Sequence, residues 1–77
     1  MSTITDRLRK IREAETSGRE EFSRLIDVSK STIASYEQTG RPPRAEIVEK
    51  VAKKWPQYAF WLITGKTENK SGNVKPR

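Results

Sequence analysis

Four polar residues in one short stretch, Lys30, Ser31, Thr32 and Ser35, carry side chains suited to reading a hydrogen-bonding surface. Lys donates to the O6 and N7 acceptors of guanine, a hydroxyl donates or accepts, and the Thr methyl packs against the thymine methyl. The same residue types are common on solvated helix faces, and for an isolated helix that plain interpretation is the better one. The chemistry therefore depends on the elements that position these four residues.

The surrounding segment, residues 18–38, predicts two short helices joined by a tight turn. Phe22, Leu25 and Ile26 share one helical face, and the apolar pattern resumes at Val28 after the turn. Asp27 suits that turn because Asp tolerates left-handed backbone angles. The second helix is apolar on one side and polar on the other. A helix-turn-helix offers side chains to the major groove of DNA in this way, so DNA binding is the leading hypothesis.

Several separate segments share their spacing with a known family. They are Arg12 in the first helix, the FSRL of the second helix, Asp27 followed by Val28 and Ser29, the IASYE of the third helix, and the WLITG that ends at Gly65. The region from about Thr3 to Gly65 resembles the λ-repressor-like, Cro-type helix-turn-helix family of phage and bacterial regulators. Three positions depart from the usual family pattern, with Arg19 in place of Gln, Ser23 in place of Ala and Asp27 in place of Gly.

The resemblance implies that the third helix is the recognition helix. In this family the positions of Lys30, Ser31 and Ser35 reach base edges, and Thr32 is a fourth candidate. Short hydroxyl side chains often read bases through water, so the target sequence cannot be decoded from these residues.

Phosphate contacts are expected from Gly18, Arg19, Arg41 and Arg44. Gly18 and Arg19 open the second helix, where free backbone N–H groups and the positive end of the helix dipole attract phosphate. Arg41 and Arg44 flank a proline-containing loop, where the family also contacts the DNA backbone. The plain alternatives are a solvated helix end and a solvated loop.

The resemblance gives Arg12 and Glu37 a structural role. In the family these two positions pair and tie the first helix to the end of the third. A partly buried ion pair specifies geometry more than it adds stability, and loss of one partner strands the other charge. Substitution of either residue is expected to destabilise the domain first and to weaken DNA binding only as a consequence.

Four aromatic residues lie close together near the end of the resembled region: Trp55, Tyr58, Phe60 and Trp61. So small a domain has little core in which to bury four large rings, so at least one is expected at the surface. In related repressors this part of the chain makes the two-fold contact. We therefore expect a homodimer through Trp55, Tyr58 or Trp61. The alternative is that all four rings close the core.

Apolar periodicity predicts five short helices and no strand, and hence a compact all-α bundle. The helices are expected at about Thr3 to Glu15, after Ser17, after Ser29, from Pro43 or Arg44, and at roughly Tyr58 to Thr64. Capping signals support three of these starts, namely Thr3 with Asp6, Ser17 with Glu20, and Ser29. Residues 1–65 are predicted to form one helix-turn-helix domain. Residues 66–77 are predicted to be a basic, disordered tail.

Composition narrows the function further. The chain of 77 residues has a net charge of +6 and contains no Cys and no His. The lack of both residue types removes disulfides, zinc-finger chemistry and the usual nucleophilic catalysts. No Gly-rich phosphate loop is present, so we expect no enzyme, cofactor, metal or small-molecule ligand. No apolar run approaches the roughly 18 residues that a membrane span needs. We expect a soluble protein of the bacterial cytoplasm or of a phage-infected cell.

The predicted function is a sequence-specific transcriptional regulator, a repressor or Cro-like protein that binds operator DNA as a dimer. The alternative is a protein-interaction module of the same fold, antitoxin-like or anti-repressor, whose aromatic C-terminal surface binds a protein. An uninterrupted basic face favours DNA, and a face broken by acidic residues favours the alternative. The basic residues concerned are Arg19, Lys30, Arg41 and Arg44, and the acidic ones are Glu20, Glu21 and Asp27.

Overall fold

The chain forms helices in the regions where the sequence predicts them. A computed structural model describes residues 3–66 and shows α1 (Ile4–Glu15), α2 (Arg19–Ile26), α3 (Lys30–Thr39), α4 (Ala45–Lys54), the short 3-10 helix η1 (Pro56–Tyr58) and α5 (Ala59–Thr64). No strand occurs in this range, and the expected all-α bundle of five short α-helices is confirmed. Apart from Lys66, the predicted tail at residues 66–77 lies outside the described residues.

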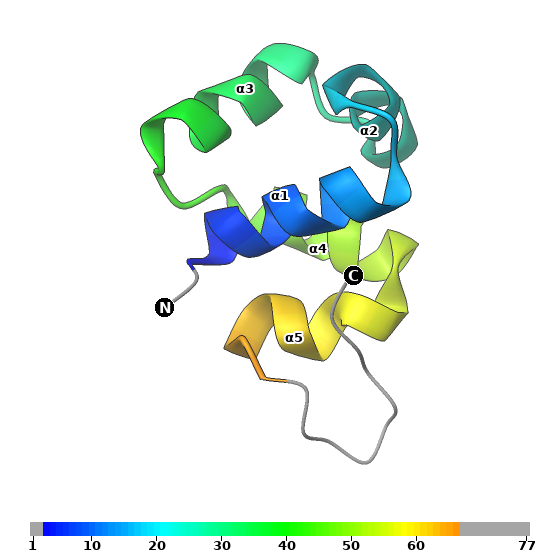
Figure 1. Cartoon of the computed structure of the whole chain (residues 1–77), viewed down its shortest axis with the longest axis vertical. Helices are drawn as coiled ribbons and strands as arrows, with labels where there is room; N and C mark the ends of the chain where they lie inside the picture. Colours follow the sequence, from blue (N-terminus) through cyan, green and yellow to red (C-terminus); the bar gives the residue numbers. More distant parts are fainter. Residues whose placement is uncertain (1–2, 67–77) are drawn as a thin grey trace.

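The helices surround one apolar core, and Figure 1 shows their arrangement. α2 and α3 lie at one end of the molecule, α1 and α4 cross the middle, and α5 lies at the other end. Every α-helix contributes to the set of fully buried side chains, which are Leu8, Ile11, Phe22, Ile33, Val51 and Leu62. Burial of each such side chain is worth about 1.5–3 kcal/mol. The shared core therefore holds α2 and α3 in a fixed position on the other helices.

Side-chain caps define two of the helix starts. The Thr3 hydroxyl accepts the Asp6 N–H at 3.1 Å and the Asp6 carboxylate accepts the Thr3 N–H at 3.3 Å, so the predicted capping box is confirmed. Ser29 also caps α3 as predicted, because its hydroxyl accepts the Thr32 N–H at 3.2 Å.

The predicted capping box at the start of α2 is wrong. Gly18, not Ser17, is the N-cap residue, and it supplies no side-chain cap. The Glu21 carboxylate instead accepts the Ser17 N–H at 2.7 Å. Both Ser17 and Glu20 are one residue too early for the box, because the helix begins at Arg19.

The turn between α2 and α3 depends on a left-handed residue. Asp27 has φ 55° and ψ 51°, as the sequence predicts for this position. The backbone N–H groups of Asp27 and Val28 both donate to the Ser23 carbonyl, and the bond from Val28 is 3.1 Å long. The Lys50 ammonium from α4 donates to the Asp27 carbonyl at 3.0 Å. These bonds satisfy the end of α2 and fix the angle at which α3 leaves the turn.

Candidate nucleic-acid interface

The polar side chains of α3 face solvent but are not equally restrained. Lys30, Ser31, Thr32 and Ser35 are all exposed. The Ser29 hydroxyl that caps the helix lies 2.7 Å from the Thr32 hydroxyl and 3.3 Å from that of Ser31. The cap therefore orients Ser31 and Thr32, whereas no such bond is seen for the side chains of Lys30 and Ser35 within residues 3–66.

The loop between α3 and α4 is anchored on both sides. The hydroxyl of Thr5, a buried residue of α1, donates to the Arg41 carbonyl at 3.0 Å. The Arg41 N–H donates to the Thr39 hydroxyl at 3.3 Å. The prolines at 42–43 restrict the backbone further. The side chains of Arg41 and Arg44 remain exposed, so this restrained loop offers two cations beside α3.

A groove of about 660 Å³ runs between α3, the loop and the start of α4. Three of the predicted base-contact residues, Ser31, Thr32 and Ser35, line one side of it. Two of the predicted phosphate-contact residues, Arg41 and Arg44, also line it. The fold thus brings the two predicted kinds of contact together in one open depression. Lys30 and Arg19 are not part of its lining.

Acidic residues interrupt the positive charge of the groove. Asp27 and Glu46 line it together with Lys50, whose ammonium lies 3.6 Å from the Glu46 carboxylate. Three basic and two acidic side chains therefore share the groove. The basic face is not continuous, and Asp27 is one of the residues that the sequence named as a possible interruption.

The hydroxyl of Tyr36 is buried beneath this groove without a hydrogen-bond partner among the described residues. Burial, and then the negative charge of neighbouring Glu37, raise the pKa of Tyr36 well above its ordinary value of 10.0. An unpaired buried hydroxyl weakens a fold by its desolvation. The phenol therefore stays protonated, and it offers no charge to a ligand in the groove.

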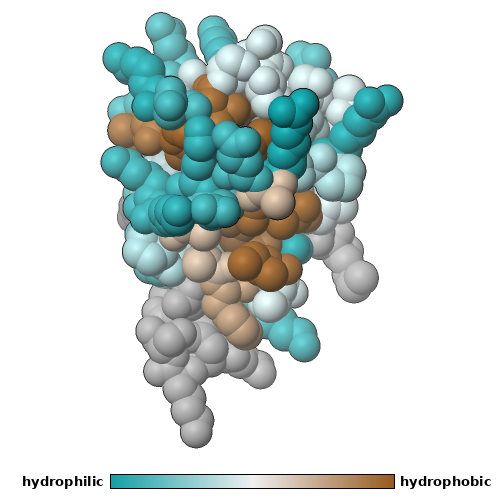
Figure 2. Space-filling view, turned by 180° about the vertical axis from the view of Figure 1, so that it is seen from behind, coloured by the Kyte–Doolittle hydropathy of each residue, from teal (hydrophilic) through white to brown (hydrophobic). Residues whose placement is uncertain are grey.

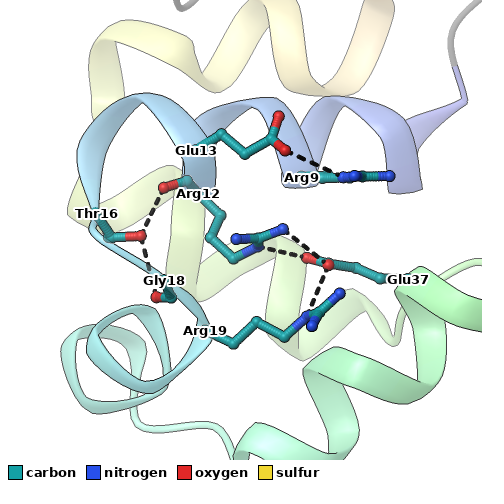
Figure 3. Close-up of polar contacts among 7 residues, drawn as sticks. All are labelled: Arg9, Arg12, Glu13, Thr16, Gly18, Arg19 and Glu37. Atoms are coloured by element: carbon teal, nitrogen blue, oxygen red, sulfur yellow. Dashed lines mark hydrogen bonds and ion pairs between the residues drawn. The ribbon is translucent and has the colours of Figure 1, made fainter.

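One buried carboxylate joins the first three helices (Figure 3). Arg12 donates to Glu37 through Nε at 2.8 Å and Nη2 at 3.1 Å, which places these two residues together as the resemblance implies. Arg19 donates to the same carboxylate through Nε at 3.0 Å. The sequence predicted Arg19 as a phosphate contact and did not reveal its bond to Glu37, because the two residues lie on different helices.

The aromatic residues predicted at a dimer interface belong to the core. Trp55, Tyr58 and Trp61 are only 5–7% exposed, and the Trp55 ring stacks on Phe22 with centroids 5.7 Å apart. Phe60 is half-buried. The assignment of these three residues to an exposed contact is therefore wrong. The core accommodates them because α4, η1 and α5 contact one another and the rings also reach the first two helices. Trp55 packs on α2 through Phe22, and the Tyr58 hydroxyl donates to the Glu15 carboxylate of α1.

Arg7 is a charged residue of α1 that lies in the interior. It is 8% exposed and its Nε donates to the Leu62 carbonyl at 2.8 Å. A signal was present, because Arg7 lies one helical turn from both Ile4 and Ile11 on the face that packs inward. Arg7 thus ties α1 to the end of α5 and is not available for DNA.

Hydrophilic side chains cover much of the end that holds α2 and α3, as the rear view shows (Figure 2), whereas apolar side chains gather across the middle of that face. Within the described residues, no cluster of His, Cys, Asp or Glu has the composition of a metal site. No described helix has the length and apolar character needed to cross a membrane.

Comparison with known families agrees with this geometry. The helix-turn-helix family, in its XRE or λ-repressor-like form, matches residues 8–54, which is more than half of the chain and includes α2, the turn and α3. The chain belongs to this family of DNA-binding regulators. No curated protein matches it closely enough to indicate a more specific relative.

Proposed function

We propose that this protein is a sequence-specific transcriptional regulator, repressor or Cro-like, that binds operator DNA as a homodimer in the cytoplasm of a bacterium or a phage-infected cell. The observation that carries the proposal is the pairing of exposed α3 side chains with the anchored Arg41 and Arg44 loop around one groove. The protein would act by occupying promoter DNA and thereby excluding or recruiting polymerase.

The two kinds of contact contribute differently to binding. Phosphate contacts supply most of the affinity and make it fall with salt, whereas base contacts decide which sequence is preferred. Arg41 and Arg44 are proposed for the phosphates. Lys30 and Ser35 are the stronger base-contact candidates on α3, because Ser31 and Thr32 already share hydrogen bonds with the Ser29 cap.

The dimer is proposed from the geometry of helix-turn-helix recognition. Two recognition helices about 34 Å apart read half-sites in successive major grooves. Since the large rings are buried, the contact must involve other side chains. Within residues 3–66 the exposed large apolar side chains are Leu25 at 40% and Ile63 at 62%. Ile63 on α5 is the better candidate, because α5 lies at the end of the molecule away from α2 and α3 (Figure 1).

One observation favours the alternative function, a module of this fold that binds another protein. Asp27 and Glu46 sit in the groove and would repel phosphates. A partner with complementary basic side chains would tolerate both residues, and Lys50 already compensates Glu46 in part.

Selection from a random-sequence duplex pool at several salt concentrations tests these two functions. Enrichment of a two-fold symmetric site establishes a dimeric operator-binding regulator and supplies its target sequence. Salt-sensitive binding without an enriched site means that the basic charge holds DNA non-specifically, and absence of binding at low salt contradicts the proposal. In either of those cases the protein-interaction alternative is preferred.

A further inference from the structure

Glu37 occupies an unusual electrostatic position for a residue of a recognition helix. Its side chain is 2% exposed, yet its carboxylate accepts three N–H groups from two arginines. One negative and two positive charges therefore meet at this point, and one positive charge remains uncompensated. The excess charge lies where α1, α2 and α3 come together (Figure 3).

The two arginines use the carboxylate differently. The Arg12 side chain is 11% exposed and is held through two of its nitrogens. The Arg19 side chain is 37% exposed and uses Nε alone. A guanidinium has five N–H donors, four of them on the two terminal nitrogens. Arg19 thus keeps most of its donors for another acceptor, while its Nε is already fixed.

Arg19 also stands at a place suited to an anion. It is the first residue of α2, directly after an N-cap glycine that has no side chain to satisfy the first N–H groups. The leading N–H groups of a helix have no partner within the helix and attract negative charge. The Arg19 side chain extends from this helix start to Glu37 on α3 (Figure 3).

We propose that Glu37 is a positioning residue for phosphate binding, which acts by holding Arg19. Glu37 fixes Nε, so that the terminal nitrogens of Arg19 are held next to Glu37, between α2 and α3, before DNA arrives (Figure 3). Arg12 compensates Glu37 and keeps it in place. Because Glu37 belongs to α3, the phosphate contact becomes linked by a 3.0 Å bond to the helix that reads the bases. This inference rests on the proposed DNA-binding function.

The physical advantage is preorganisation. A free Arg side chain loses rotamer freedom when it binds a phosphate, and a side chain fixed in advance loses less. A Gln at position 19, as is usual in the resembled family, offers neither a charge nor a second set of donors. The proposal therefore concerns a property of this chain that depends on Arg19 and Glu37 together.

A double-mutant cycle on Arg19 and Glu37 tests the proposal. Affinity for one fixed mixed-sequence DNA duplex would be measured across a salt series for the wild type, Arg19→Gln, Glu37→Gln and the double variant. Arg24→Gln is the matched control, since Arg24 is an exposed cation of the same helix and its loss changes the net charge equally. Thermal unfolding of each variant shows which of them are folded.

We expect Arg19→Gln to weaken binding by about tenfold, the effect of one charge-assisted hydrogen bond. We also expect it to lower the slope of log affinity against log salt by about 1. Arg24→Gln should change neither quantity appreciably. In the Glu37→Gln background, loss of Arg19 should cost less than about threefold, because an unheld side chain contributes less.

Equal effects of Arg19→Gln and Arg24→Gln, or the same Arg19 effect in both backgrounds, overturn the proposal. If the wild type itself binds no duplex at low salt, the proposed function fails instead. If Glu37→Gln does not fold, nitrogen-15 NMR of the arginine side chains in the wild type decides. The proposal is supported if the Arg19 Nε–H exchanges with solvent more slowly than the Arg24 Nε–H and its chemical shift does not change when the duplex is added. Equal exchange rates overturn it.

Discussion

The hydroxyl-bearing residues of α3 differ in how they can take part in recognition. Thr32 is held by the cap through a 2.7 Å contact between its hydroxyl and that of Ser29, whereas Ser35 is one turn further along and outside that network. Lys30 is the longest side chain on this face and the one with a full positive charge. At the residue scale, we therefore expect substitution of Lys30 or Ser35 to change DNA binding without disturbing the cap.

Replacement of Lys30 by Glu should abolish specific binding and leave the fold intact. The substitution removes a donor to bases and adds a charge that DNA repels, for a loss of at least about tenfold in affinity. Fluorescence anisotropy on the duplex enriched from the random pool measures this change in affinity. Lys54→Glu makes the same charge change at the C-terminal end of α4 and serves as the control. If the two variants behave alike, α3 is not the recognition helix.

Replacement of Tyr36 by Phe should stabilise the protein. It removes a buried hydroxyl that has no partner, and we expect a gain of about 1 kcal/mol in urea unfolding.

The same substitution should change the dependence of stability on pH. Because burial raises the pKa of Tyr36, the unfolded chain releases this proton near pH 10.0 while the folded chain retains it. The ionisation of Tyr36 therefore leaves the unfolding free energy of the wild type unchanged below about pH 10. Above that pH the unfolding free energy falls, because the unfolded chain loses the proton and the folded chain keeps it. Tyr36→Phe should show a shallower decline in that range, and parallel curves would contradict the burial of the hydroxyl.

At the scale of the elements, the helix ends decide how well α2 and α3 are oriented. Asp27 holds the left-handed position that ends α2, and residues other than Gly are strained there. Asp27→Gly should raise the unfolding free energy by about 0.5–1 kcal/mol. It should also strengthen DNA binding, since it removes an acid from the groove. Asp27→Ala relieves the charge but not the strain, so it separates the two effects.

The end of α5 offers a second test at this scale. Gly40 and Gly65 both end helices with positive φ, 72° and 76°. An added Cβ meets nothing within 4 Å at Gly40, but at Gly65 it comes within 3.1 Å of Arg7 Nη1. Both Gly→Ala variants should lose about 1 kcal/mol from backbone strain. Gly65→Ala should lower the unfolding free energy more, because it also disturbs the hydrogen bond from Arg7 to the Leu62 carbonyl, which ties α1 to α5. Equal thermal shifts would show that Arg7 adapts freely.

At the scale of the whole molecule, the spacing of the half-sites tests the proposed dimer. A two-fold dimer requires half-sites about 10–10.5 base pairs apart, so that both recognition helices face the same side of the duplex. Insertion of about five base pairs between the selected half-sites turns one of them to the opposite side. Affinity should then fall to that of a single half-site, measured by anisotropy. Unchanged affinity would indicate that the protein binds as a monomer.

The sequence by itself determined the local structure. Thr3, Ser29 and Asp27 mark helix ends through bonds within a few residues. The aliphatic spacing identifies most of the buried face of each helix, although Leu25, which it places on one face with Phe22 and Ile26, is 40% exposed. The membership of α2 and α3 in a helix-turn-helix follows from the same local patterns, because each depends on residues close together in the chain. The fold class and the helix-turn-helix were therefore predictable.

Only the tertiary structure decided which distant groups meet. The bond from Arg19 to Glu37, the burial of Arg7 against α5 and the anchoring of the loop by Thr5 each join different helices. The aromatic segment likewise became core because neighbouring helices cover it. A charged or aromatic side chain has the same local pattern in water and in a pocket, so its partner and its burial are fixed by packing across the chain.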